Sequence, residues 1–326
     1  DLNDVRPAGE SLKGFGGMAN PVKLKDLYPR VTSLLNKAVG RKLTSIECCL
    51  LIDEAAVYDV AQKSPLELAA NLSVRINNRV WMKREDLQSV FSFKLRGANN
   101  KLATLTQEVI SNGVICSSAG NHAQGVALAA QRREIRAVIV MPITTPSIKV
   151  SAVKALGGEI LLHGDTYDDA YVKARELAAS ESLTFIHPFD DPAVIAGQGT
   201  IGRELVSQMS EKVSAVFVPI GGGGLISGIA SYLKGKRPHI RIIGVEPEDS
   251  AAMKKSLEAG RPVSLDHVGI FADGVAVRRV GDETFRICKE LVDEIITVDT
   301  DQILSLIHIS EPTRRTPISY AVFCLK

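Results

Sequence analysis

Lys94 has sequence neighbours that suggest a chemically reactive amine. It lies in SVFSFKLRGA, residues 89–98, between Phe93 and Leu95 and close to Phe91. A lysine is ordinarily a solvated surface residue, but a partly desolvated lysine is available as a neutral amine for Schiff-base formation. The apolar neighbours therefore make Lys94 a candidate for covalent attachment of a carbonyl compound.

A second stretch with chemical potential is SSAGNHAQG, residues 117–125, where an expected strand meets an expected helix. Its small residues leave backbone N–H groups accessible to an anion. Asn121 adds a side-chain amide that can bond a ring oxygen. His122 has the chemistry of a base, but a histidine that opens a helix is more often structural, and we favour that interpretation.

The third stretch is PIGGGGLISG, residues 219–228, with four consecutive glycines between an apolar run and a helical pattern. Such a turn gathers N–H groups and a helix N-terminus at one point, which suits a phosphate. A P-loop is excluded because the lysine and hydroxyl residue that it requires are missing. A dinucleotide fingerprint fits Gly222 and Gly224, with Glu246 on the ribose, but its third position is Ser227. A tight turn without a ligand is the remaining alternative.

The elements that must position these stretches alternate along the chain from Val57 onward. Several apolar runs show no alternation, which is typical of strands buried on both faces of a parallel sheet. The expected strands are residues 80–83, 114–120, 137–142, 159–164, 184–189, 215–221, 241–247 and 294–299. The expected helices are residues 93–103, 121–132, 147–156, 167–180 and 224–234. This alternation predicts an α/β fold with right-handed crossovers.

Composition narrows the classes of partner. The chain has 326 residues and a net charge of +2, from 39 Lys and Arg against 37 Asp and Glu. This balance favours neither nucleic acid nor an anionic membrane, and no apolar run is long enough to cross a bilayer. The five cysteines include no CxxC pair, which argues against a zinc site and fits a reduced compartment.

Taken together, FSFKLRGA, SSAGNHAQGVA, PIGGGGLISGIA and FADGVAV resemble the pyridoxal-phosphate enzymes of fold type II. Within that group the sequence resembles the threonine deaminases, and WMKREDLQSVFSFKLRGA is similar to their plant biosynthetic form. The resemblance extends from about Val57 to Asp301. It implies two open, mostly parallel sheets flanked by helices, with the cofactor between two subdomains.

The resemblance also implies roles for individual residues. Lys94 matches the lysine that binds pyridoxal 5'-phosphate covalently, Phe93 the residue against the pyridine ring, and Asn121 the residue that bonds the ring hydroxyl. The implied phosphate loop is Gly221, Gly222, Gly223, Gly224 and Leu225. The implied substrate-binding residues are Ser118, Ala119, Gly120, Asn121, His122 and Gly274.

The implied reaction is α,β-elimination from L-threonine, with L-serine as a secondary substrate, to give a 2-oxo acid and ammonia. The cofactor stabilises the negative charge at Cα, and Lys94 takes the α-proton as general base. The family resemblance points to the cofactor phosphate as the acid that protonates the leaving hydroxyl. Related serine racemases resemble SSGNH, where a second serine supplies a second base, whereas Ala119 stands there in this chain. Because alanine carries no proton, dehydration is favoured over racemisation.

The relatives' metal site is incomplete in this sequence. Glu246 matches one acid, but Ala252 stands where the next is expected, and we predict no required divalent metal. Three other functions stay open: a catabolic serine and threonine dehydratase, an inactive truncated fragment of the same fold, and, less favoured, an NAD-dependent oxidoreductase built on the glycine loop.

The expected organisation is an N-terminal extension at 1–55 and a catalytic domain at 56–304. Its large subdomain spans about 56–89 and 191–304, and its small subdomain about 90–190. Residues 305–326 match no part of the family pattern and show no periodic helix. We therefore expect a tail that replaces the rest of the catalytic domain and the isoleucine-binding regulatory domain, so that isoleucine regulation is lost.

We further expect a homo-oligomer, a dimer or a tetramer. The location is the chloroplast stroma if the source is a plant, with a transit peptide upstream of Asp1, and otherwise the cytoplasm.

Overall fold

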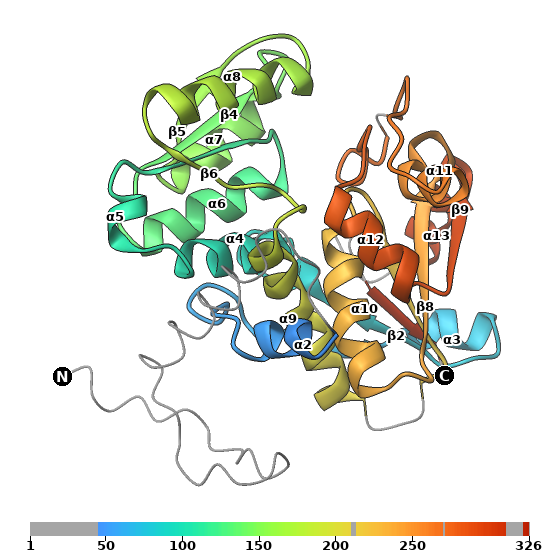
Figure 1. Cartoon of the computed structure of the whole chain (residues 1–326). Helices are drawn as coiled ribbons and strands as arrows, with labels where there is room; N and C mark the ends of the chain where they lie inside the picture. The colour runs from blue at the N-terminus through green and yellow to red at the C-terminus, as the bar shows by residue number, and fades with distance from the viewer. Residues whose placement is uncertain (1–44, 210–212, 270, 311–321, 326) are drawn as a thin grey trace, which may run out of the picture.

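The computed structural model describes residues 45–209, 213–269, 271–310 and 322–325 (Figure 1). The helices are α2 (Ser45–Asp53), α3 (Ala70–Arg75), α4 (Lys94–Ala103), α5 (Gln107–Ile110), α6 (Asn121–Arg132), α7 (Ser147–Ala155), α8 (Tyr167–Ser180), α9 (Pro192–Gln208), α10 (Gly224–Lys236), α11 (Ala252–Ala259), α12 (Asp282–Leu291) and α13 (Thr300–Ser310). The strands are β1 (Leu66–Leu68), β2 (Val80–Lys83), β3 (Val114–Ser117), β4 (Ala137–Met141), β5 (Glu159–Leu162), β6 (Thr184–Phe185), β7 (Ala215–Pro219), β8 (Arg241–Pro247), β9 (Glu294–Val298) and β10 (Val322–Leu325).

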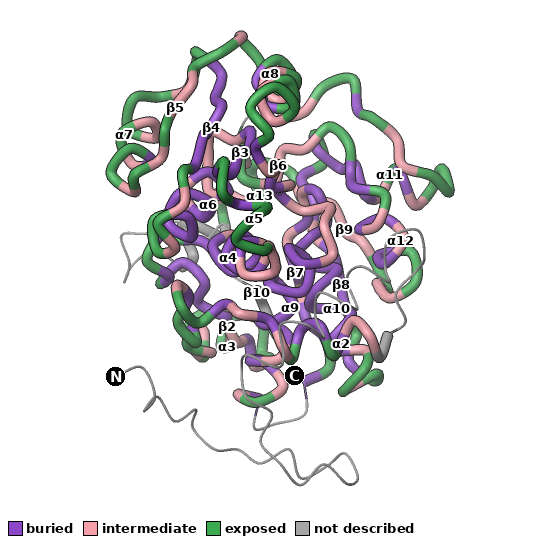
Figure 2. The backbone as a smooth tube through the Cα atoms, turned by 60° about the vertical axis from the view of Figure 1, so that its left-hand side comes forward, coloured by how far each residue is buried: buried purple, intermediate pink, exposed green. Residues whose placement is uncertain are grey.

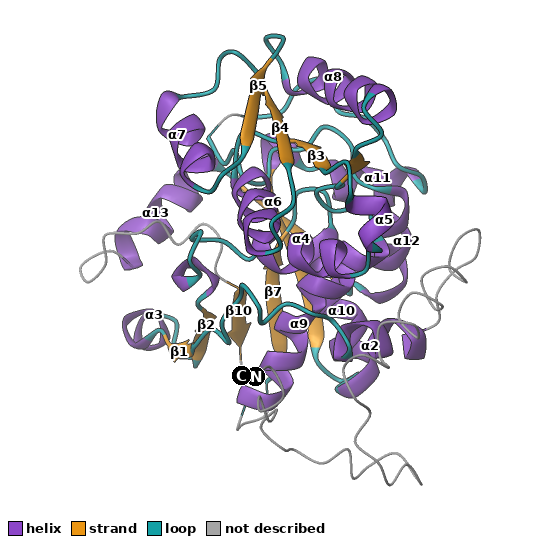
Figure 3. Ribbon diagram, turned by 90° about the vertical axis from the view of Figure 1, so that its left-hand side faces the viewer, coloured by secondary structure: helices purple, strands orange, loops and turns teal. Residues whose placement is uncertain are grey.

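A small parallel sheet forms one lobe of the molecule, with strand order β5-β4-β3-β6 (Figure 3). Alternate residues of β3 serve two cores. Val114 and Cys116 pack with α4, α6 and α7, whereas Ile115 packs with α8. Both faces of the strand are therefore apolar, which explains the unbroken hydrophobic run in the sequence.

A larger mixed sheet forms the other lobe, with strand order β1-β2-β10-β7-β8-β9. Strands β7, β8 and β9 are parallel to one another, whereas β10 is antiparallel to both β2 and β7. The main core of this lobe lies where α9, α10 and α12 pack on β7 and β8. Figure 2 shows buried backbone concentrated in these inner elements and exposed backbone on outer helices such as α5 and α8.

The predicted α/β fold is confirmed, and each expected strand and helix is found with boundaries shifted by a few residues. The largest difference is the strand expected at 184–189, which ends at Phe185. The Nδ1 atom of His187 accepts the backbone N–H groups of Phe189 and Asp190, at 3.3 and 2.8 Å, and this turns the chain away from the sheet. Pro188 has no N–H to donate to a ladder.

The expectation that residues 305–326 contain no helix is wrong for their first part, since α13 runs to Ser310. The helix begins with a reciprocal cap. Asp299 accepts the N–H of Gln302 at 2.8 Å, and the Gln302 side chain accepts the N–H of Asp299 at 3.1 Å. Residues 311–321 of the expected tail lie outside the described residues. The described strand β10 lies between β2 and β7 and pairs with both.

Within the expected N-terminal extension, residues 1–44 lie outside the described part, but α2 packs on α9 and α10. Cys49 and Ile52 are buried against α9 and α10. Tyr232 donates its hydroxyl to Asp53 at 2.8 Å. Among the described residues, no helix is both long enough and apolar enough to cross a membrane.

Candidate functional site

Lys94 is the first residue of α4, and Phe93 precedes it as the N-cap. The Lys94 amine donates a hydrogen bond to the carbonyl oxygen of Pro188 at 3.3 Å and lies 5.5 Å from the centre of the Phe93 ring. Burial lowers the pKa of this amine to about 8, and no carboxylate in the described part of the chain raises it again. A large neutral fraction at mildly alkaline pH is what a Schiff-base lysine needs.

The start of α6 lies beside the start of α4. A Cβ atom at Gly125 would come within 3.0 Å of the Lys94 backbone, so the two helices touch at this glycine. Asn121 lies one turn earlier on the same face of α6. It is half-buried, and its side chain has no hydrogen-bond partner among the described residues, which leaves its amide available to a ligand.

The loop before α6 contains a hydrogen bond between its own residues. The Ser118 hydroxyl accepts the N–H of Gly120 at 3.2 Å. A Cβ atom at Gly120 would meet nothing within 4 Å, so the backbone there borders free space. Ala119 is partly buried against the core of the small sheet. The loop therefore presents backbone and a hydroxyl group, and its assignment to the substrate carboxylate stays a prediction.

His122 is buried in the wall of the site. Its Nε2 atom lies 3.0 Å from the carbonyl oxygen of Ile186, so this nitrogen carries the proton and donates it. Burial, followed by the charge of Lys94, lowers the pKa of His122 to about 3, and the ring is neutral. These contacts support the structural interpretation of His122 rather than a base.

The glycine loop follows β7 and has two kinds of constraint. Gly223 is the N-cap of α10 in the left-handed region, with φ +94°, and no side chain caps this helix. Gly222 and Gly224 lie against Phe189, where Cβ atoms would come within 2.2 and 3.0 Å of it. The first N–H groups of α10 are consequently left for a ligand. Leu225, in the first turn, is buried in the core.

The segment from Ile186 to Asp191 links these parts and was not singled out in the sequence. The Pro188 carbonyl accepts the Lys94 amine, and the Phe189 ring covers two glycines of the loop. The Asp190 carboxylate accepts N–H groups at the start of α12. The Asp–Pro pair at 191–192 predicts the start of α9. No local pattern in the sequence predicts that the turn before it contacts both Lys94 and the glycine loop.

Gly274 occupies a more outlying place than the resemblance implies. It is exposed, and its neighbour Val275 is the residue that approaches the glycine loop, 3.0 Å from a Cβ atom placed on Gly221. Asp273 forms an ion pair of 2.5 Å with Lys149 of α7. This loop thus lies between the two lobes beside the glycine loop, while a direct role of Gly274 stays a prediction.

Glu246 does not serve a nucleotide in this structure. Its side chain is fully buried, and its two oxygens accept the N–H groups of Met253 and Lys254 at 2.8 and 2.9 Å. Burial raises the pKa of Glu246 to about 7 despite these bonds. The residue caps α11, and this assigned role removes the main support for the dinucleotide interpretation. The described residues include no cluster of three or more His, Cys, Asp or Glu side chains that could hold a metal ion.

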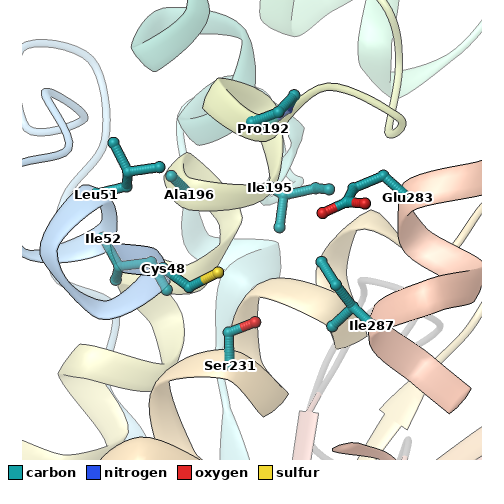
Figure 4. Close-up of a pocket in the computed structure, with 9 residues that line it drawn as sticks. All are labelled: Cys48, Leu51, Ile52, Pro192, Ile195, Ala196, Ser231, Glu283 and Ile287. Atoms are coloured by element: carbon teal, nitrogen blue, oxygen red, sulfur yellow. The ribbon is translucent and has the colours of Figure 1, made fainter. Parts of the chain in front are cut away.

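A separate small pocket lies where α2 packs on α9, α10 and α12 (Figure 4). It is lined by Cys48, Leu51, Ile52, Pro192, Ile195, Ala196, Ser231, Glu283 and Ile287. It contains none of the residues predicted for the site. We therefore assign it to the packing of α2.

The residues present fit pyridoxal phosphate. Lys94 supplies an amine without a counter-charge, Asn121 an unpaired amide, and the loop from Gly221 to Gly224 a helix N-terminus without a side-chain cap. Each of these groups matches one functional part of the cofactor: the aldehyde, the ring hydroxyl and the phosphate.

Comparisons with known proteins agree with this geometry. The family model described as pyridoxal-phosphate dependent enzyme matches residues 57–310. A biosynthetic chloroplastic threonine dehydratase of Solanum lycopersicum is 56% identical over 81% of this chain and 44% of its own length. The chain spans about half the length of the curated relatives that it matches.

Two solved structures extend the comparison. The processed form of threonine deaminase isoform 2 from Solanum lycopersicum has a TM-score of 0.82 and 49% identity, over 84% of this chain and 80% of that chain. Maize serine racemase has a TM-score of 0.80 and 33% identity, over 83% of each chain. On its family match, its fold and the groups gathered around Lys94, this chain belongs to the pyridoxal-phosphate-dependent enzymes of fold type II.

Proposed function

We propose that this chain catalyses the deamination of L-threonine to 2-oxobutanoate and ammonia. The observation that carries the proposal is the desolvated amine of Lys94, which has no carboxylate partner among the described residues. It is linked through Pro188 and Phe189 to an uncapped glycine turn. The similarity to proteins named threonine dehydratase and threonine deaminase supports this substrate.

Lys94 would act twice in this reaction. As a neutral amine it binds the cofactor, and once released it accepts the proton from Cα of the substrate. The Pro188 carbonyl holds the amine at one position and offers no proton that would compete. Burial favours both roles because it keeps a large share of the amine unprotonated near pH 8.

The loop from Ser118 to Asn121 would bind the substrate carboxylate. It offers backbone N–H groups, a hydroxyl and an amide, and it contains no acidic side chain to repel the anion. Bound pyridoxal phosphate supplies the electron sink that makes the Cα proton acidic. The β-hydroxyl then leaves as water, and the released enamine tautomerises and is hydrolysed to the oxo acid.

Ala119 favours elimination over racemisation. A racemase needs a second proton-carrying group on the opposite face of the substrate, and an alanine methyl carries none. The structural likeness to maize serine racemase shows that the shared fold by itself does not choose between the two reactions. The choice lies in this loop.

The wider context follows from the same relatives. We infer a role in the first step of isoleucine biosynthesis, with L-serine as a slower substrate, in a homo-oligomer. Two of the relatives carry chloroplastic in their names, which supports the chloroplast stroma if the source is a plant. Size-exclusion chromatography with light scattering tests the assembly.

The test is turnover by the purified chain with pyridoxal phosphate. We expect 2-oxobutanoate and ammonia in equal amounts from L-threonine, a lower rate with L-serine, and no D-serine from L-serine. D-Serine formation at a comparable rate would favour the racemase. Absence of turnover by a folded chain that binds the cofactor at Lys94 would favour the inactive fragment.

A further inference from the structure

Thr284 makes a contact that ordinary helix packing does not explain. Its side chain is fully buried in the first turn of α12, 62 residues after the glycine loop. The hydroxyl donates to the carbonyl oxygen of Gly222 at 2.7 Å, and the carbonyl of Gly281 lies farther away at 3.2 Å. The backbone N–H of Gly281 approaches the same Gly222 oxygen at 3.5 Å.

This contact fixes the direction of one peptide group. The C=O of Gly222 and the N–H of Gly223 belong to the same trans peptide, in which the two bonds point in opposite directions. Because the C=O points at Thr284, the Gly223 N–H points away from α12. Gly223 is the N-cap of α10, so its N–H joins the free N–H groups of that helix at the phosphate loop.

The same contact also holds Gly223 in its left-handed conformation. A Cβ atom at Gly223 would lie 2.8 Å from the Thr284 Cβ and 2.8 Å from the Met253 Cε. Rotation of the Gly222–Gly223 peptide would leave the buried Gly222 carbonyl without the Thr284 hydroxyl, which would keep only its longer contact with the Gly281 carbonyl at 3.2 Å. Losing a hydrogen bond in a buried place is costly.

Asp190 supports Thr284 from the other side. Its carboxylate accepts the N–H groups of Asp282, Glu283 and Thr284 at 3.0, 3.0 and 3.2 Å, and so anchors the start of α12. Asp190 is two residues from Pro188, whose carbonyl accepts the Lys94 amine. One short turn therefore sets the position of the lysine and of the helix that orients the phosphate loop.

We propose that Thr284 is a positioning residue for the cofactor phosphate, acting by aiming the Gly223 N–H into the phosphate loop. This rests on the proposed assignment of residues 221–225 as that loop. Thr284 itself touches neither cofactor nor substrate. Its removal weakens the grip on the phosphate and leaves the lysine unchanged.

The experiment compares two ligands that differ only in the phosphate. Pyridoxal 5'-phosphate and pyridoxal are titrated into the cofactor-free protein, and binding is followed by the visible absorbance of the lysine-bound form. For Thr284→Val, which keeps the shape and removes the hydroxyl, we expect about tenfold weaker binding of the phosphate form, the effect of one hydrogen bond to a charged ligand. Binding of pyridoxal stays unchanged. Thr284→Ser, which keeps the hydroxyl, retains the wild-type ratio of the two dissociation constants.

The outcomes separate this inference from the assignment beneath it. An unchanged ratio in Thr284→Val, or equal weakening of both ligands, overturns the role of Thr284. A wild-type protein that binds both ligands equally overturns the phosphate loop and the inference with it. Asp190→Asn gives an independent measurement if Thr284→Val does not fold, since it keeps the hydroxyl and weakens its support. There we expect a smaller loss in the same ratio, and an unchanged ratio counts against the proposal.

Discussion

Lys83, which is fully buried, and Lys94, which is half-buried, lie close together in the chain and have opposite surroundings. Lys83, at the end of β2, donates to Glu204 at 2.5 Å, to the Ser64 carbonyl at 2.6 Å and to Gln208 at 2.8 Å. Among the described residues, the Lys94 amine donates to one acceptor, the Pro188 carbonyl at 3.3 Å. Burial lowers the pKa of both amines, but at Lys83 the charge of Glu204 opposes this effect.

Lys83 belongs to a buried ionic cluster that holds the lobes together. Glu204 of α9 also accepts Arg96 of α4 at 2.7 Å, and Arg96 in turn pairs with Glu85 at 2.8 Å. All these side chains are nearly inaccessible to solvent. Lys83 is thus paired with a counter-charge, whereas Lys94, the lysine that we propose to react, has none among the described residues. This keeps the Lys94 amine available as a nucleophile.

The largest effect should follow from Lys94→Met. We expect turnover of L-threonine to fall by at least about 10²–10⁴-fold, the contribution of a positioned acid–base group. Stability in urea should not decrease, because the substitution removes a buried amine that had no ionic partner. Steady-state kinetics and urea unfolding on the same preparation measure both. Retained turnover by the Lys94→Met protein would contradict the catalytic role proposed for Lys94.

The same substitution at the other lysine should act on stability. Lys83→Met leaves Glu204 buried with one partner fewer, and we expect the free energy of unfolding to fall by about 3–5 kcal/mol. The protein that remains folded should still bind pyridoxal phosphate at Lys94. A stable Lys83→Met protein that has lost cofactor binding would show that the roles of the two lysines are not separate.

The acidity of Lys94 can be measured without the cofactor. Since its pKa is lowered to about 8, the fraction of free amine rises as the pH rises through 8. The rate of acetylation of this residue by a limiting amount of acetic anhydride should follow that titration. An unperturbed lysine in a model peptide has a pKa of about 10.4. Peptide mass spectrometry over a pH series gives the midpoint for each lysine, and a midpoint near 10 for Lys94 would contradict its assigned environment.

A smaller effect is expected from Gly223→Ala. The residue has φ +94°, and its new methyl group would lie 2.8 Å from Met253 and Thr284, so we expect a loss of about 1–3 kcal/mol in unfolding free energy. Gly260→Ala is the matched control, since Gly260 has φ +71° with nothing within 4 Å of the added methyl. The control should lose less, and equal losses would mean that the packing around Gly223 is unimportant.

The sequence points to the residues proposed for the site, but not to the long-range contacts that hold them in place. Lys94, Asn121 and the four glycines are local signals, and the strands that carry them are short apolar runs. The pairing of Lys83 with Glu204 joins residues 121 positions apart, and no local pattern marks it. No local pattern marks the contact of Phe189 with Gly222 either. The sequence therefore suggested only a ligand-binding role for the glycines, whereas Gly222 and Gly224 are also required by close packing against Phe189.

At the start of the expected tail, by contrast, a local signal was present in the sequence and was missed. Residues 305–310 were expected to lack a helix because residues 305–326 show no helical periodicity, yet a local capping box at Asp299 and Gln302 starts one. The cap was readable in the sequence as D-x-x-Q. The expectation rested on the periodicity of the tail itself and overlooked the cap that precedes it.

Borohydride reduction of the protein loaded with pyridoxal phosphate, followed by peptide mapping, tests the contrast between the lysines most directly. Reduction fixes the cofactor to the amine that binds it. We predict that the reduced cofactor is found on Lys94 and that Lys83 is unmodified. Attachment to Lys83, or to several lysines equally, would contradict the claim that the lysine without a counter-charge is the reacting one.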